Sequence, residues 1–289
     1  MVSQAPASDK NLLHYPWRIA ALVVAFANVT FNVINSRLGT PGPSVADVSA
    51  KYPTLFTPAG FAFAIWGLIY GSTLLYAVSA LLPRQLDVRM HDRIAPWLLA
   101  SSALSSLWIV CFSTEHFIPS LVIIAAILAC TVAMYSIASD HLVSEHLSHF
   151  WRLPFGLWMS WLGVATLANL CVTLSANDVP AWPVSAAVWT AILLGFAGLV
   201  AVSIAAVFLD PVVCLVVSWA TAAIAVAHWE DSALVAVVAA LVALKTLLLG
   251  VRLLAFSNLP LPSRERERLE HDLRAMPPHG RHDRVSAGA

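Results

Sequence analysis

Charged residues are scarce in this sequence. Lys, Arg, Asp and Glu together make up only 11% of its 289 residues, whereas hydrophobic residues make up 59% and the mean hydropathy is +0.78. A soluble domain cannot hide so much apolar surface, because its ratio of area to volume forces polar residues outward. This composition therefore predicts a protein that is embedded in a membrane.

Cysteines are few, and signatures of catalysis are lacking. Thiols in apolar stretches behave as small buried hydrophobes, so the four cysteines predict neither a disulfide framework nor a metal cluster. They are Cys111, Cys130, Cys171 and Cys214. The formal net charge of zero gives a nucleic-acid partner no electrostatic support. Since no Walker loop, dinucleotide fingerprint or serine–histidine–acid motif is present, we expect neither an enzyme nor a bound cofactor.

Long apolar stretches predict eight transmembrane helices, because several exceed the ~20 residues that a bilayer-spanning helix needs. Prolines stand near the start of most of them, where a helix tolerates proline. The sixth and seventh are divided at Asp210–Pro211, since one helix over 183–228 would be roughly 69 Å long. The predicted spans are 17–36, 59–82, 94–112, 118–139, 153–175, 183–208, 211–228 and 232–256.

The basic residues predict how these spans are oriented. The first apolar stretch holds three asparagines and has no small-residue cleavage site, so we expect a retained span rather than a signal peptide. Eight spans put both termini on one side. Thirteen of the 16 basic residues fall on that side, and only Arg37 and Lys51 fall on the other. The positive-inside rule then predicts cytoplasmic termini, in a membrane of the bacterial inner-membrane type.

Several polar residues lie inside the predicted spans. Asn28, Asn32 and Asn35 form a stripe along one face of the first span, which we expect to face other helices or a cavity. Asn169, late in the fifth span, is a candidate partner for this stripe. Lys245 lies near the middle of the last span, where an ionisable side chain is either functional or reaches toward the interface.

Tryptophans also lie deep in the spans, where each indole N–H needs a partner or an aqueous cavity. Trp66 and Tyr70 interrupt the apolar row of the second span. Trp158 and Trp161 are three residues apart in the fifth span, a spacing that predicts a shared helix face. A cavity lined by such rings would suit a flat, apolar, aromatic ligand.

The stretch "KYPTLFTPAGFAFAIWGLIY" resembles the hallmark of the TspO/MBR family, the tryptophan-rich sensory proteins related to the mitochondrial translocator (peripheral benzodiazepine receptor). That hallmark reads roughly K-P-x-W-T-P-P-G, then F-x-x-x-W, then L-Y. The matching residues are Lys51, Thr57, Pro58, Gly60, Phe63, Trp66 and Tyr70. Phe56 stands in place of the family's tryptophan and Ala59 in place of its second proline.

Two later segments resemble the same family in the same order. "ALSSLW" is similar to A-L-N-x-x-W of the third helix, with Trp108 kept and Ser105 in the asparagine's place. "LPFGLWMSWLGVATLANL" is similar to P-x-x-x-W-x-x-F-A-x-x-L-N of the fifth helix. Aligning the proline selects Trp158 as the family tryptophan, whereas aligning Asn169 selects Trp161. We prefer Trp161, because the eight-residue spacing from tryptophan to asparagine is kept.

The resemblance implies an all-α integral membrane protein with a TspO-like five-helix bundle over 17–175. Three additional transmembrane helices follow over 176–256, between a cytoplasmic segment (1–16) and a charged, disordered cytoplasmic tail (257–289). The family implies a tryptophan-lined pocket for tetrapyrroles such as protoporphyrin and heme precursors, or for sterols, and frequent homodimers. The candidate ligand-binding residues are Trp66, Trp161, Trp158, Trp108, Tyr70, Asn169 and Asn32.

Two functions follow from these patterns. The first is a membrane sensor or regulator that binds a flat hydrophobic ligand, tetrapyrrole or sterol-like, within the bilayer. The alternative is a small-molecule transporter or permease that uses the asparagine stripe and Lys245. Eight spans suit a transporter, but the halves of the sequence show neither an inverted repeat nor matching broken helices.

Overall fold

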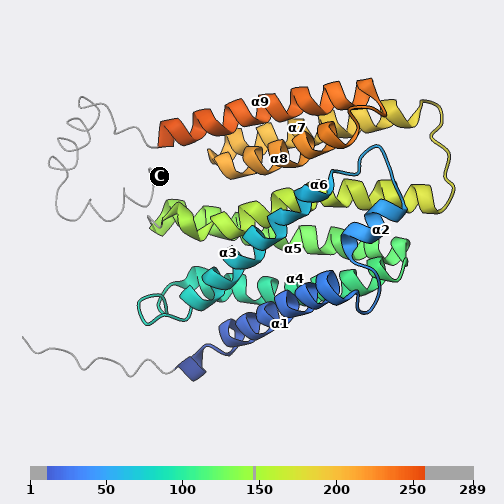
Figure 1. The fold of residues 1–289 in the computed structure, drawn as a ribbon. Helices are drawn as coiled ribbons and strands as arrows, with labels where there is room; N and C mark the ends of the chain where they lie inside the picture. The colour runs from blue at the N-terminus through green and yellow to red at the C-terminus, as the bar shows by residue number, and fades with distance from the viewer. Residues whose placement is uncertain (1–11, 146–147, 258–289) are drawn as a thin grey trace, which may run out of the picture.

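The computed structural model describes residues 12–145 and 148–257, and these ranges contain helices but no strands. The eight longest of these helices run back and forth between the two ends of the molecule (Figure 1). They are α1 (Pro16–Leu38), α3 (Ile65–Ser79), α4 (Arg89–Ser113), α5 (Phe117–Glu145), α6 (Leu153–Ala176), α7 (Ala186–Phe208), α8 (Pro211–Ala227) and α9 (Ala233–Ser257). Shorter helices lie in the connections: η1 (Leu12–His14), α2 (Val45–Lys51), η2 (Gly60–Ala64) and η3 (His149–Trp151).

Seven segments within the described ranges are long and apolar enough to cross a bilayer. The seventh predicted span corresponds to α8, which is apolar but has only 17 residues. It therefore covers about 26 Å at ~1.5 Å per residue, less than the ~30 Å hydrocarbon core. Seven full-length candidate spans and one shorter apolar helix thus stand where eight spans were predicted, because α8 starts directly at Pro211 and ends before the turn at His228. The chain is a multi-pass integral membrane protein.

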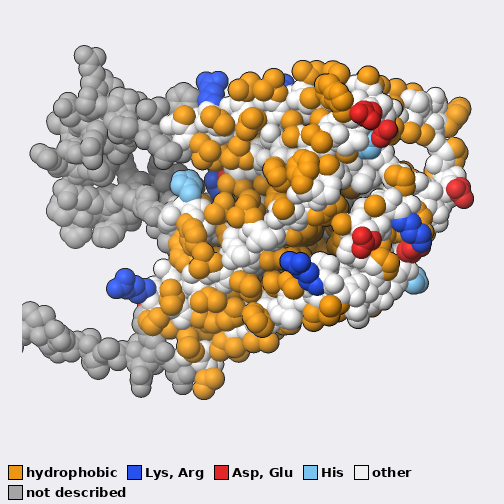
Figure 2. All heavy atoms as spheres, in the orientation of Figure 1, with side chains coloured by type: hydrophobic (Ala, Val, Ile, Leu, Met, Phe, Trp, Pro, Cys, Tyr) orange, Lys and Arg blue, Asp and Glu red, His pale blue; other side chains and the backbone are white. Residues whose placement is uncertain are grey.

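The outer surface is apolar, as contact with lipid requires. Hydrophobic side chains are spread over the whole face shown in Figure 2 between the two ends of the helices. Large side chains such as Phe26, Leu199 and Leu248 are more than 60% exposed. Such extended apolar patches are rare on soluble monomers, and here they match the spans that cross the membrane.

Helices α7, α8 and α9 form a layer on one side of the first five long helices (Figure 1). Helix α8 joins this layer to the rest, since it packs against α6 and η2 as well as α7 and α9. The predicted turn at Asp210–Pro211 is confirmed. There Leu209 adopts a positive φ of 48°, and the Asp210 carboxylate caps α8 by accepting a hydrogen bond from the Val212 N–H at 3.0 Å.

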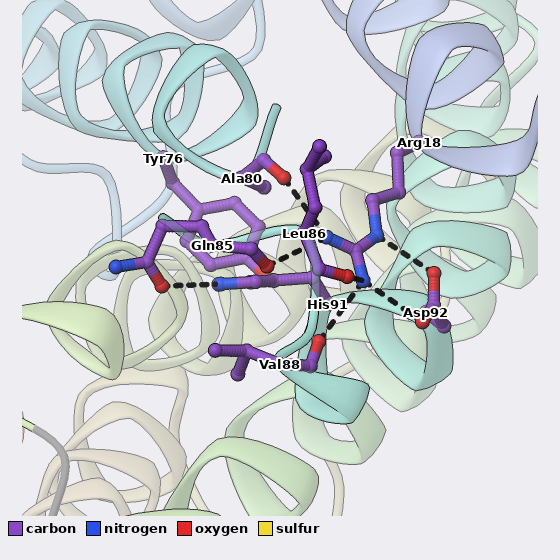
Figure 3. A network of polar contacts seen from close by, with 8 residues as sticks. All are labelled: Arg18, Tyr76, Ala80, Gln85, Leu86, Val88, His91 and Asp92. Carbon is purple, nitrogen blue, oxygen red and sulfur yellow. Dashed lines mark hydrogen bonds and ion pairs between the residues drawn. The ribbon is translucent and has the colours of Figure 1, made fainter. Parts of the chain in front are cut away.

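A buried arginine fixes α1 against the connection between α3 and α4 (Figure 3). The Arg18 guanidinium is 2% exposed and binds both carboxylate oxygens of Asp92, at 2.7 and 2.8 Å. It also donates to four carbonyls of the connection, those of Ala80, Gln85, Leu86 and Val88. A guanidinium offers five N–H donors in a fixed plane, so one side chain can order this whole turn.

Helix α4 starts earlier than predicted. It begins at Arg89 rather than near residue 94, so Pro96 lies inside the helix instead of in its first turn. Four of the seven helical residues before Pro96 are charged or polar (Arg89, His91, Asp92 and Arg93), and a hydropathy pattern does not detect helix of that kind. The predicted disordered tail and most of the predicted N-terminal segment lie outside the described residues.

Candidate functional site

A small cavity lies between α3, α4 and α6, beneath the connection that joins α1 to α3. Its volume is about 50 Å³. Aromatic rings from four elements, η2, α3, α4 and α6, line it, together with one buried amide. The principal lining residues are Phe63, Trp66, Trp108, Phe112, Trp161 and Asn169. Four of the seven candidate residues thus meet around one cavity, although they come from three helices far apart in the sequence.

The rings around this cavity pack mostly edge to face. The Trp161 ring lies 6.3 Å from the Trp66 ring at an interplanar angle of 83°, and 6.3 Å from the Phe63 ring at 78°. On the opposite wall, Trp108 stacks on Phe112 at 5.1 Å and 23°. Such contacts hold aromatic walls in fixed positions. A flat aromatic ligand would meet ring faces and edges that are already oriented.

Two of the lining tryptophans carry indole N–H groups with no hydrogen-bond partner among the described residues. These are the buried Nε1 atoms of Trp108 and Trp161. A buried donor without a partner is unfavourable, and it can bind an acceptor on a ligand. The Asn169 amide is already engaged, because its Nδ2 and Oδ1 atoms lie 3.0 and 3.1 Å from the Ser120 hydroxyl of α5.

Tyr70 and Asn32 lie behind the cavity wall rather than in it. The Tyr70 ring stacks on Trp66 at 5.2 Å and 22°, and its hydroxyl donates a hydrogen bond to Asn32 Oδ1. The Asn32 amide in turn donates to Asn28 Oδ1 at 2.9 Å, and that oxygen also accepts from the Ser106 hydroxyl of α4. Polar contacts therefore connect the back of Trp66 to α1 and α4.

Trp158 is fully buried but does not line the cavity. The predicted shared helix face of Trp158 and Trp161 does not bring both rings to this cavity. A separation of three residues leaves side chains about 60° apart around a helix, and here only Trp161 points into the cavity. The register that aligns Asn169 therefore selects the tryptophan that lines it.

The asparagine stripe of α1 is used in contacts between helices. Asn28 binds Ser106, and the Asn35 amide donates to the Ser113 hydroxyl at 3.2 Å. The suggested pairing of Asn169 with the stripe is wrong, because Asn169 binds Ser120 instead. The position of Asn169 on α6 places its amide against α5, on the other side of the cavity from α1.

The connection between α1 and α3 forms the roof of the cavity. Val45 and Ser49 of α2 line it from above, as do Thr57 and Pro58. The start of α2 is fixed by a capping box in which Ser44 and Asp47 bind each other's backbone. We name residues 39–59 the roof segment.

Charged side chains hold the roof segment to the turn between α4 and α5. The Glu115 carboxylate forms an ion pair with Lys51 and accepts a hydrogen bond from the Tyr52 hydroxyl at 2.6 Å. The hydrogen bond from Lys51 lowers the pKa of Glu115, while the carboxylate raises the pKa of Lys51. Glu115 adopts a positive φ of 63°, an unfavourable conformation for this residue type.

Sequence patterns missed the contribution of Glu115, which lies 64 residues from Lys51. They also missed Phe112, although Phe112 follows Trp108 at helical spacing and could have been found that way.

Lys245 lies on the exposed outer face of α9 and away from the cavity. None of the described His, Cys, Asp and Glu residues form a group of three or more that could hold a metal ion.

Comparison with known proteins gives one match. The family described as TSPO-like protein matches residues 18–252, which include every residue that lines the cavity. The match continues through α7 and α8 and into α9, so it is not confined to the first five long helices. No curated protein and no solved structure matches the chain.

Proposed function

The chain belongs to the TSPO-like protein family, and from that premise we propose that it is a membrane sensor or regulator of a flat hydrophobic ligand. The ligand is a tetrapyrrole or a sterol-like molecule, bound in the cavity between α3, α4 and α6. One observation carries the proposal. Trp66, Trp108 and Trp161 converge on this cavity from three helices, and two of their indole N–H groups have no partner in the described part of the chain.

The chemistry of the wall favours a flat ring system with oxygen acceptors at its edge. Aromatic faces and edges bind a planar apolar ligand by stacking, and the Trp108 and Trp161 N–H groups would bind carbonyl or carboxylate oxygens. A charged side chain is not among the lining residues. Binding would therefore depend on shape and on a few hydrogen bonds, as in most small-molecule pockets.

The volume of the cavity implies that the roof segment moves when a ligand binds. The cavity holds about 50 Å³, whereas pockets for drug-sized ligands usually hold ~300–1,000 Å³. The helices around it are long and packed against neighbours, but α2 has only seven residues. Displacement of α2 is therefore the simplest way to enlarge the site.

The features that suggested a transporter lie elsewhere in the protein. The asparagines of α1 bind α4 and Tyr70, and Lys245 faces outward from α9. Among the described residues, none of these side chains lines the aromatic cavity. The binding of a ligand for sensing or regulation therefore accounts for the site better than a permeation path does.

A titration with protoporphyrin IX tests this proposal. Quenching of tryptophan fluorescence in the purified chain should saturate, and Trp66→Phe or Trp161→Phe should weaken binding about five-fold, since a ring contact contributes roughly 0.5–1.5 kcal/mol. Trp189→Phe is the matched control, because Trp189 is 42% exposed on the outer side of α7. Competition by cholesterol would then identify a sterol-like ligand. Unsaturable quenching, or wild-type affinity in both cavity variants, would contradict the proposal.

A further inference from the structure

Helix α8 belongs to the added layer, yet its second half binds the segment that closes the aromatic cavity. Trp219 and Ala223 are four residues apart, so they lie on one face of α8, and His228 follows directly where the helix ends. All three form hydrogen bonds with residues 57–62, which comprise the end of the roof segment and the start of η2. We name these three hydrogen bonds the α8 contacts.

The first of the α8 contacts joins a buried side chain to a residue that lines the cavity. His228 is only 8% exposed, and its Nε2 atom lies 3.0 Å from the carbonyl oxygen of Thr57. A carbonyl oxygen can only accept, so Nε2 carries the proton and donates. The other ring nitrogen, Nδ1, has no hydrogen-bond partner among the described residues and lies 3.6 Å from the exposed carboxylate of Asp231. Within the described ranges, the bond to Thr57 is therefore the only hydrogen bond of this ring.

The second contact is a backbone hydrogen bond that a proline could not form. The Ala59 N–H donates to the Ala223 carbonyl of α8 at 3.1 Å. Ala59 stands where the TspO/MBR hallmark has its second proline, and proline has no N–H. The φ of Ala59 is −57°, a value that proline also adopts, so the backbone conformation does not itself require alanine. The departure from the hallmark thus supplies a donor to the added layer.

The third contact holds η2, which carries one ring of the cavity wall. The Trp219 Nε1–H donates to the Ala62 carbonyl at 3.1 Å. The next residue, Phe63, lines the cavity, as do Thr57 and Pro58. Each of these three lining residues therefore either takes part in one of the α8 contacts or is adjacent in sequence to a residue that does.

We propose that the α8 contacts position this wall of the aromatic cavity, with His228 as the principal positioning residue, so that the added layer is part of the ligand site. The inference rests on the proposed function of that cavity. On the other side, Glu115 holds the end of α2 through an exposed ion pair. A ligand that displaces α2 breaks that pair but leaves the α8 contacts in place. Thr57 and Pro58 are then already in position when the ligand binds, which lowers the cost of binding.

Titration of the full chain with protoporphyrin IX tests the positioning role. His228→Leu removes the side-chain donor at similar size, and Ala59→Pro removes the backbone donor at a compatible φ. Each should weaken binding about five-fold, the loss expected for one hydrogen bond of roughly 1 kcal/mol. His228→Gln should bind within two-fold of the wild type, because its amide N–H can reach the same carbonyl. Trp229→Phe is the matched control with wild-type affinity, since Trp229 is the next residue and is 70% exposed.

Hydrogen exchange of the ligand-free protein tests the α8 contacts separately. Exchange at residues 57–64 should be at least five-fold faster in His228→Leu than in Trp229→Phe. This comparison needs no ligand, so failure of the wild type to bind protoporphyrin would contradict the proposed function and not the contacts. Equal exchange in the two variants, or wild-type affinity in both His228→Leu and Ala59→Pro, would overturn the inference. So would a loss of affinity in His228→Leu that His228→Gln does not restore, because a general loss of stability would then account for it.

Discussion

Arg152 and Asp210 form a buried ion pair that joins the added helices to the first five. Arg152 Nε lies 3.0 Å from Asp210 Oδ2, and the two side chains are only 7% and 4% exposed. Tyr135 of α5 donates a hydrogen bond to the same carboxylate oxygen at 2.9 Å, and Arg152 also donates to the Phe208 carbonyl at 3.2 Å. The start of α6, the middle of α5 and the turn between α7 and α8 therefore meet at one carboxylate.

Removing one partner of this pair should destabilise the protein strongly. Asp210→Ala leaves the Arg152 charge buried without a counter-ion and removes the cap of α8, so we expect a loss of about 3 kcal/mol in the free energy of unfolding. The double variant Arg152→Met with Asp210→Ala should recover part of that loss. Thermal unfolding in detergent measures both. A double variant less stable than Asp210→Ala would show that the charge of Arg152 is satisfied in another way.

Several parts of the fold could be predicted from local sequence. The length of the apolar stretches predicted a membrane protein. A single helix over 183–228 would have been too long for a bilayer, which predicted the turn at Asp210–Pro211 that the structure contains. The order of the motifs also brought Trp66 and Trp161 together as candidates before their 6.3 Å contact was known. These predictions succeed because helix length and spacing are local properties of the chain.

Other features depend on contacts between distant segments. Spacing alone could not show which side of α6 faces the cavity, so Trp158 and Trp161 were grouped although only one lines it. The ion pair of Lys51 with Glu115, which joins the end of α2 to the turn between α4 and α5, left no pattern in the sequence. The cavity lined by α5, α6, α7 and α8 depends on how α7 packs against α6, which hydropathy does not describe.

The orientation of the chain in the membrane can be tested with single cysteines. The basic-residue count predicts that the connection between α3 and α4 is cytoplasmic and that the turn between α8 and α9 lies on the opposite side. In intact cells a membrane-impermeant maleimide should therefore label Glu230→Cys and not Arg84→Cys. Permeabilised cells should show label on both, because both positions are exposed. If intact cells instead label Arg84→Cys and not Glu230→Cys, the chain has the opposite orientation to the one predicted.

Close packing of the roof segment against the end of α4 should limit access to the aromatic cavity. A Cβ atom at Gly42 would lie 2.5 Å from the Ser113 carbonyl oxygen, so Gly42→Ala must displace the segment. We expect protoporphyrin to associate at least two-fold faster in this variant, as measured by stopped-flow fluorescence. Gly60→Ala is the matched control, because its Cβ would meet nothing within 4 Å. Equal rates in the two variants would show that the roof segment does not limit binding.

The ion pair between Lys51 and Glu115 should make release of the ligand depend on pH. Lys51 lowers the pKa of Glu115 below its ordinary value of 4.5, so the pair persists at neutral pH and is lost as the pH falls through that lowered pKa. The raised pKa of Lys51 keeps the lysine charged up to and beyond pH 10.5. Bound protoporphyrin should therefore dissociate more slowly at pH 7 than at an acidic pH low enough to protonate Glu115. Glu115→Gln should release it about three-fold faster at pH 7, as expected for an exposed pair, and should lose the difference between the two pH values. If protoporphyrin still dissociates faster from Glu115→Gln at acidic pH, a titrating group other than Glu115 causes the pH dependence.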